Sequence, residues 1–307
     1  MIDTLNLRLE KSFSQSDLND LRNRLDDPGE HFPQDGYFIT GRLKNLSITA
    51  GITGLSIKKG SLAKYFLNDN IQTLTRSTLE QAINQLSEEL ELSLNQAKIT
   101  RVDIGCNFLM KFKPESYLHC LLECPSYKRK PYDHGVYFGH GTKTKVFYDK
   151  IEDCKVNKVE VPVICKGRNL LRYEFRLLGR IADFFQVDEF TAKDLYQEAN
   201  YMKMIDEYHR QYENIVKKKT LSPDIPENLT VKSFKDYLFN LAVYELGSER
   251  AYQEYNFFKK NKKFKQAADA SRAKKEIKKV FSGDKMKDSE LIEELNQKIK
   301  ALKFNYR

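Results

Sequence analysis

Three strand-like segments that each carry carboxylates constrain this chain most strongly. They read KITRVDIGCNF (98–108), GVYFGHGTKTKVFYDK (135–150) and NLLRYEFRLLG (169–179). Side chains alternate between the two faces of a strand, so Asp103 falls on the face opposite to the apolar residues of its segment. Glu174 falls opposite to the apolar residues of the last segment in the same way. The pattern predicts strands with one apolar and one charged face.

The charged face of these strands combines acids with arginines. Arg101 shares the face of Asp103, and Arg172 and Arg176 flank Glu174. Carboxylates among arginines are the parts of a hard-metal site that handles phosphate. The same pattern is also typical of a solvated sheet face with cross-strand ion pairs. The spacing alone does not separate these two interpretations.

The order of the elements predicts an α+β fold. Strands, a helix and a strand bearing Arg-x-Asp are followed by a helix, strands and a strand bearing Arg-x-Glu. We expect a mainly antiparallel sheet built of two pseudo-repeated halves, with helices on one face and a helical C-terminal region after it. The prolines and turn residues of 217–230 predict a linker. This places one domain at 1–216 and a basic helical domain at 231–307.

Positive charge is concentrated near the C-terminal end. The chain has a formal net charge of +9, and residues 255–287 hold twelve Lys or Arg against three Asp or Glu. Lysines interleaved with phenylalanines suit a nucleic-acid surface. A helix with a phenylalanine core and a solvated lysine face gives the same pattern. We favour DNA contact, through Lys259, Lys260, Lys262, Lys263 and Lys265.

Cysteine usage and hydropathy narrow the class of protein. The five cysteines are odd in number and lie in apolar contexts, which predicts buried thiols in a reducing cytoplasm. Cys120 and Cys124 are one helical turn apart beside His119, but they lack a second pair at ligand spacing, so we favour thiols over a zinc site. No apolar run approaches the roughly 20 residues of a membrane helix. We therefore expect no membrane partner.

Six segments in one order resemble the gene II/X replication initiation proteins of phages and plasmids, whose type case is the filamentous-phage gene II nickase. They are MIDTLNLRL, LSIKKGSLAKYFLNDN, ITRVDIGCNF, VYFGHGTKTKVFYDK, LRYEFRL and DLYQEANYMKMIDEYHRQYENI. The YFG…YDK and RYEFRL elements are also similar to the replication-transfer (Rep_trans) plasmid initiators. The resemblance covers roughly residues 1–216. It implies a rolling-circle initiator that acts in the cytoplasm of a bacterial host.

The chemistry that the resemblance implies is a transesterification. A tyrosine hydroxyl attacks a DNA phosphate, forming a 5′-phosphotyrosine and a free 3′-OH, while Mg²⁺ or Mn²⁺ stabilises charge on the phosphate. Related nickases often bind the metal with two histidines separated by one residue, and the five histidines here include no such pair. In the replication-transfer type that the chain resembles, carboxylates take over metal binding, so the resemblance implies Asp103 and Glu174 as ligands, with Asp149 as a third candidate.

The resemblance places the nucleophile on a helix predicted over 191–216. Tyr201, Tyr208 and Tyr212 fall near one face of it, whereas Tyr196 lies farther round. Tyr208 and Tyr212 have the spacing expected of two tyrosines that alternate in cleavage and joining. Tyrosines that merely pack on a buried stripe give the same pattern. We rank Tyr212 first, then Tyr208, then Tyr201.

The remaining expectations concern phosphate and partners. We expect Lys150 to neutralise the scissile phosphate or help to deprotonate the tyrosine, and Arg101, Arg172 and Arg176 to grip flanking phosphates. The expected partners are the origin as duplex and single strand, a host helicase and a host polymerase. Two other functions stay open: a mobilisation relaxase, and a non-enzymatic origin-binding or copy-control protein.

Overall fold

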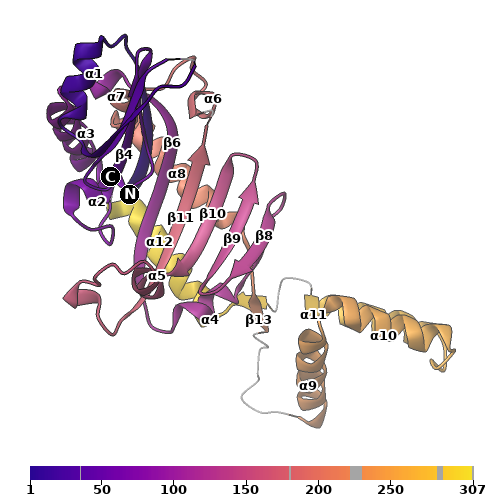
Figure 1. The fold of residues 1–307 in the computed structure, drawn as a ribbon. Coiled ribbons are helices and arrows are strands. Elements are labelled where there is room, and N and C mark those ends of the chain that lie inside the picture. Colours follow the sequence, from indigo (N-terminus) through magenta and orange to yellow (C-terminus); the bar gives the residue numbers. More distant parts are fainter. Residues whose placement is uncertain (35, 180, 222–229, 282–285, 306–307) are drawn as a thin grey trace. The chain divides into compact units, whose positions relative to one another are not determined.

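The chain forms two compact units (Figure 1). The first joins Met1–Val216 to Glu294–Arg307, and the second is Lys217–Glu293. This computed structural model describes residues 1–34, 36–179, 181–221, 230–281 and 286–305.

The first unit is built on one ten-stranded sheet in which all neighbouring strands are antiparallel. Together with its helices, this sheet confirms the predicted α+β class. From one edge to the other the strands are β2 (Asp26–His31), β3 (Phe38–Leu43), β4 (Leu46–Gly51), β5 (Gly54–Lys58), β1 (Ile2–Glu10), β6 (Lys98–Met110), β11 (Asn169–Leu178), β10 (Lys143–Asp149), β9 (Gly135–His140) and β8 (Lys128–Tyr132).

Short hairpins order the strands at both edges of the sheet. Two residues each connect β3 to β4, β8 to β9 and β9 to β10. Such tight connections need residues with positive φ. Lys44, His134 and Gly141 supply them, with φ of 54°, 60° and 54°. The last two turns place β8, β9 and β10 side by side, next to the carboxylate-bearing strands.

The centre of the sheet joins the two predicted halves. β6 and β11 pair along their length, with Asp103 opposite Arg176 and Gly105 opposite Glu174. The apolar faces of both strands are buried. The sequence therefore placed both carboxylates on the correct face, and the strand pairing makes them neighbours.

Helices cover the apolar face (Figure 1). The longer ones are α1 (Gln15–Arg22), α3 (Arg76–Leu90), α8 (Glu198–Glu213) and α12 (Glu290–Asn305). The core between α8 and the sheet is aromatic, because Tyr173 stacks on Phe147 at 4.2 Å and contacts Tyr208 at 4.3 Å between ring centroids. The unit's shorter elements are α2 (Leu62–Leu67), α4 (Pro114–Leu118), α5 (Lys150–Val156), α6 (Ile181–Phe185), α7 (Ala192–Leu195), β7 (Leu121–Glu123) and β12 (Val216–Lys217).

The helix predicted over 191–216 is interrupted. α7 ends before Tyr196, and α8 begins after Gln197, whose extended backbone (φ −60°, ψ 134°) serves as its N-cap. An extended residue breaks the ladder of helical hydrogen bonds. The break separates Tyr196 from the other three tyrosines, which all lie on α8.

The described residues of the second unit form three helices and a short pair of strands. The elements are α9 (Val231–Leu246), α10 (Ser248–Lys260), α11 (Ala267–Phe281), β13 (Lys219–Leu221) and β14 (Met286–Asp288). Its small core is formed by Val243, Ala251, Tyr255, Ala270, Ile277 and Val280. No helix in the described parts of the chain is long and apolar enough to cross a membrane.

The C-terminal end is organised differently from the sequence expectation. The domain predicted at 231–307 included the last helix, but α12 belongs to the first unit from Glu294 onward. Asn296 on α12 accepts a hydrogen bond of 2.6 Å from the Tyr212 hydroxyl, and Leu295 is fully buried. Most of the linker predicted at 217–230 falls on 222–229, outside the described residues, and its start forms β13.

Candidate functional site

Five charged side chains meet on the polar face of β6 and β11. We call Arg101, Asp103, Arg172, Glu174 and Arg176 the charged cluster. The strand register sets Arg176 beside Asp103, and ion pairs link Arg176 to both carboxylates, at 3.7 Å to Asp103 and 2.6 Å to Glu174. The cluster is therefore one connected set of charges, as the predicted face required.

Glu174 is the centre of this cluster. Its Oε1 accepts from Arg172 Nε at 2.6 Å and from the Tyr148 hydroxyl at 2.8 Å. Its Oε2 accepts from Arg176 Nε and Nη2 at 2.9 and 2.6 Å. Burial alone would raise the pKa of Glu174, but the two arginines outweigh it and hold that pKa well below its usual value. Glu174 is therefore ionised at neutral pH.

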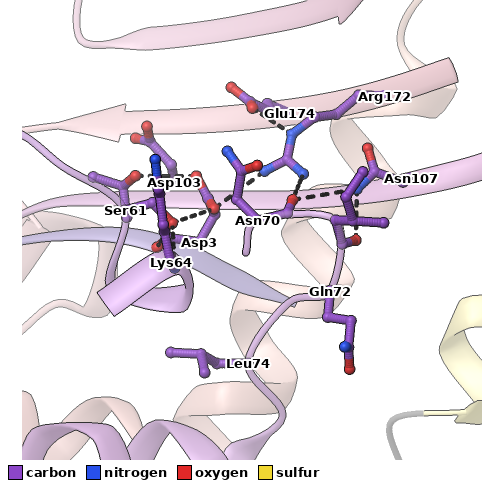
Figure 2. A network of polar contacts seen from close by, with 12 residues as sticks. Asp3, Ser61, Lys64, Asn70, Gln72, Leu74, Asp103, Asn107, Arg172 and Glu174 are labelled. Carbon is purple, nitrogen blue, oxygen red and sulfur yellow. Dashed lines mark hydrogen bonds and ion pairs between the residues drawn. The ribbon is translucent and has the colours of Figure 1, made fainter. Parts of the chain in front are cut away.

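Arg172 places its guanidinium between Glu174 and Asn70 and contacts both (Figure 2). Its side chain is fully buried, donates to the Asn70 carbonyl at 2.9 Å and lies 3.3 Å from Asp3. Neighbouring acids raise its pKa against the effect of burial. We expected Arg172 to grip a DNA phosphate, but its buried side chain is not accessible to one in this structure. In this structure the side chain positions Glu174, and only Arg101 and Arg176 of the cluster reach solvent.

Asp103 differs from Glu174 in its proton affinity. Arg101 holds it with Nε at 2.8 Å from Oδ1 and Nη2 at 2.5 Å from Oδ2. Burial nevertheless dominates and raises the pKa of Asp103 to about 6, although Arg101 and Arg176 lower it. Asp103 is therefore the carboxylate of the cluster that exchanges protons near neutral pH.

A tyrosine that the sequence analysis did not select joins the cluster. Tyr148 lies on β10 directly opposite Arg172, on the polar face, and its hydroxyl donates to Glu174. Burial raises the pKa of the Tyr148 phenol well above its usual value. Alternation within β10 would have placed Tyr148 and Val146 on one face and Asp149 on the other. The missing signal was the register with β11, which tells which of those faces holds Glu174.

A cavity of about 400 Å³ opens beside Tyr148. It lies at the end of β10 where α5 begins, and its wall combines acids, aromatics and one arginine of the cluster. The lining residues are Tyr132, Asp133, His134, Tyr148, Asp149, Glu152, Asp153, Val156 and Arg176. Tyr148 and Arg176 are thus accessible from one open space.

Asp149 and Lys150 are engaged locally. Asp149 is the N-cap of α5, with Oδ1 accepting from the backbone N–H groups of Ile151 and Glu152 at 2.8 and 3.1 Å. Burial raises the pKa of Asp149. Lys150 is buried, pairs with Asp153 at 2.8 Å and lies 5.8 Å from the centre of the Tyr148 ring. Capping explains Asp149 without a metal, whereas Lys150 is close to the cavity.

The three α8 tyrosines lie on the other side of the sheet. Tyr201, Tyr208 and Tyr212 are all buried. Their hydroxyls donate to the Leu74 carbonyl, the Tyr173 carbonyl and Asn296 Oδ1 respectively. The sheet itself separates them from the charged cluster. Their predicted catalytic role stays a prediction, and the structure does not bring them together with the predicted carboxylates.

The charged cluster, as arranged, does not fit a metal ion. All oxygens of Glu174 accept hydrogen bonds from side chains, and both oxygens of Asp103 pair with Arg101. Among the described residues, no three His, Cys, Asp or Glu side chains gather to hold a metal. The Mg²⁺ or Mn²⁺ expected from the resemblance stays a prediction. All five cysteines are buried and unbridged, as expected.

Comparison with known families places this face of the sheet within a replication protein. The model of the Phage_CRI family, which describes the N-terminal part of a replication-associated protein, matches residues 36–209, more than half of the chain. The chain belongs to this family. No curated protein sequence matches it. The predicted resemblance to phage replication initiators is therefore confirmed at the level of the Phage_CRI family, and the finer likeness to the gene II/X and replication-transfer groups stays a prediction.

The family match contains the whole charged cluster and Tyr148, but it ends before the predicted lysine surface. Those lysines are exposed at the end of α10 and in the turn to α11. Phe257 and Phe258 beside them are 59% and 45% exposed, whereas Phe264 packs against the core of the second unit. The core reading of the lysine–phenylalanine pattern thus holds for Phe264. Phe257 and Phe258 are exposed, and DNA contact through the lysines stays a prediction.

Proposed function

We propose that this Phage_CRI family chain initiates rolling-circle replication by nicking one DNA strand, with Tyr148 as the nucleophile. The observation that carries the proposal is the 2.8 Å hydrogen bond from the Tyr148 hydroxyl to Glu174, within a face rich in arginine. Membership of a phage replication family supports DNA as the substrate. The α8 tyrosines have no comparable setting, because their hydroxyls bond to backbone or amide oxygens on the opposite face.

In the proposed step, the Tyr148 hydroxyl oxygen bonds to the scissile phosphorus while the bond from phosphorus to the 3′ oxygen breaks. The phenol proton leaves to water in the cavity beside Tyr148, because the arginines that lower the pKa of Glu174 make its carboxylate too weak a base to keep that proton. The departing 3′ oxygen takes up a proton and becomes the free 3′-OH. Asp103, with a pKa of about 6, supplies or removes a proton within the same cluster.

The arginines of the cluster have two different roles in the proposed step. Arg101 and Arg176 have side chains that are 28% and 31% exposed, so they can donate to the phosphate oxygens on which charge develops. Arg172 keeps Glu174 ionised and fixed in place. Because the pKa of the Tyr148 phenol is raised, its oxygen becomes negatively charged only at a cost in free energy. Nearby arginines are needed to stabilise that charge during the attack.

The second unit and the host complete the proposed function. Lys259, Lys260, Lys262, Lys263 and Lys265 would supply salt-dependent affinity for the origin duplex. The nick leaves a 3′-OH that a host polymerase extends while a host helicase opens the duplex, in the bacterial cytoplasm.

The test is a nicking assay on a supercoiled plasmid that carries the replication origin of the phage or plasmid that encodes this protein. Tyr148→Phe removes the attacking oxygen and keeps the ring, so nicking should fall to background while the protein stays folded. Tyr208→Phe and Tyr212→Phe are the matched controls and should nick as the wild type does. Wild-type nicking by Tyr148→Phe would overturn the assignment. Running the assay with and without Mg²⁺ tests the expected metal, and a transfer-origin plasmid tests the relaxase alternative.

A further inference from the structure

We propose that β8 and β9 form a stacking subsite for the single-stranded DNA that reaches Tyr148. The subsite consists of Tyr132, Tyr137, Lys128 and Lys130. It rests on the proposed function, because it is argued as the path of the strand to that nucleophile.

The strand register brings the subsite to the nucleophile. Gly135 on β9 lies between Tyr132 on β8 and Tyr148 on β10, so these three residues form one row across the sheet. In the next row, Lys130 lies opposite Tyr137. All of these side chains share the polar face with the charged cluster. The subsite is thus a direct continuation of the candidate site toward the β8 edge.

Two tyrosine rings lie across glycines on this face. A Cβ at Gly135 would collide with the ring of Tyr132, and one at Gly139 would come within 2.5 Å of Cε1 of Tyr137. Each ring therefore covers the backbone of a glycine instead of standing away from the sheet. Tyr132 is 50% exposed, and Tyr137 is half-buried with its hydroxyl 3.1 Å from Thr144 Oγ1. Flat, partly exposed rings of this kind are platforms on which bases stack.

The charged side chains that line two neighbouring cavities indicate from which side the DNA strand approaches Tyr148. A second cavity of about 500 Å³ is lined by Lys130, Pro131, Tyr132, Tyr137, Val146 and Arg176, with no acidic side chain. The cavity beside Tyr148 is lined by four acids, namely Asp133, Asp149, Glu152 and Asp153. The cavity lined by Lys130 and Arg176 attracts a polyanion more strongly than the acid-lined cavity does, so we expect the strand to approach Tyr148 over β8 and β9. Tyr132 and Arg176 line both cavities, so a strand in the second cavity leads to the first.

Single-stranded DNA fits this surface better than duplex. Stacking on a protein ring requires a base with a free face, which an unpaired strand offers and a continuous duplex does not. Lys128 and Lys130, both exposed on the edge strand, are placed to meet the phosphates of that strand.

The test measures binding of an oligothymidine, an abasic sugar–phosphate oligomer of the same length, and a duplex. A stacked base contributes about 1–3 kcal/mol, so Tyr132→Leu and Tyr137→Leu should each weaken oligothymidine binding by about tenfold. Binding of the abasic oligomer should not change. Tyr132→Phe and Tyr137→Phe keep the rings and should bind as the wild type. Lys130→Gln should weaken binding of both the oligothymidine and the abasic oligomer. The control Lys58→Gln, which removes an exposed lysine from the same face at β5, should weaken neither.

The outcomes separate the subsite from the proposed nucleophile. Unchanged oligothymidine binding by both leucine variants, with thermal unfolding as in the wild type, would overturn the subsite whatever Tyr148→Phe does. Equal losses on the abasic oligomer or on the duplex would also overturn it, since stacking would then not be the cause. If Tyr148→Phe still nicks while the leucine variants lose base-dependent binding, the nucleophile is wrong and the subsite stands.

Discussion

Asp103 and Glu174 share one sheet face but have opposite proton affinities. Arg172 and Arg176 outweigh burial at Glu174 and lower its pKa, whereas burial outweighs Arg101 and Arg176 at Asp103 and raises its pKa. Environments that separate the pKa values of two carboxyl groups are a mark of sites that move protons. The structure therefore distinguishes two residues that the sequence treated as equivalent metal ligands.

The first prediction concerns the pH dependence of stability. Because the pKa of Asp103 is raised from 3.8 to about 6, the folded protein binds more protons than the unfolded chain between these values. The contribution of Asp103 to the unfolding free energy therefore falls as pH rises through about 4 to 6, by roughly 3 kcal/mol in total. Asp103→Asn should remove this slope in urea unfolding. An unchanged slope, equal to that of the exposed control Asp20→Asn, would contradict the assigned pKa.

At the scale of elements, α5 offers a direct test of a predicted ligand. Asp149→Ala removes the N-cap of α5 and should cost about 1 kcal/mol of unfolding free energy. Asp149→Asn keeps an oxygen for the cap and should cost less. Because capping alone explains this residue, the asparagine variant should nick with the Mg²⁺ requirement of the wild type. A raised Mg²⁺ requirement in that variant would restore Asp149 as a ligand.

The sequence predicted strands and their faces better than helix placement. Alternation located β6, β9, β10 and β11 and the polar side of Asp103, because each strand has one buried face. Periodicity could not tell that α8 covers the face opposite to Glu174, since a stripe of tyrosines fits either side. It also could not show that Asn296 and Leu295 join the first unit. Tyr148 was missed because its partner is fixed by strand register, which is a long-range property.

At the scale of the whole molecule, the proposed function assigns cleavage to the first unit and DNA affinity to the second. Removing everything after Val216 is a poor test of it, because the deletion takes α12 away from the first unit. Point substitutions in the second unit avoid that problem. Glutamine at Lys259, Lys260, Lys262, Lys263 and Lys265 keeps the side-chain length roughly constant while removing charge.

The five-glutamine variant should bind origin duplex with a weaker salt dependence. Each lost phosphate contact lowers the log–log slope by about 0.9, so the full effect is at most about 4.5. Nicking of a single-stranded origin oligonucleotide should persist. The control carries glutamine at Lys232 and Lys235 of α9, which are exposed but lie outside the lysine surface. A slope equal to that of the control would show that the lysine surface is only solvated.

The central claim is that Tyr148 forms the covalent bond to DNA, and mapping that bond tests it most directly. A single-stranded origin oligonucleotide labelled 3′ of the nick is incubated with the protein, and the SDS-resistant adduct is digested and sequenced by mass spectrometry. The account predicts an adduct on the peptide that contains Tyr148, and none with Tyr148→Phe. An adduct on Tyr201, Tyr208 or Tyr212 would contradict it and would require α8 to leave the apolar face of the sheet.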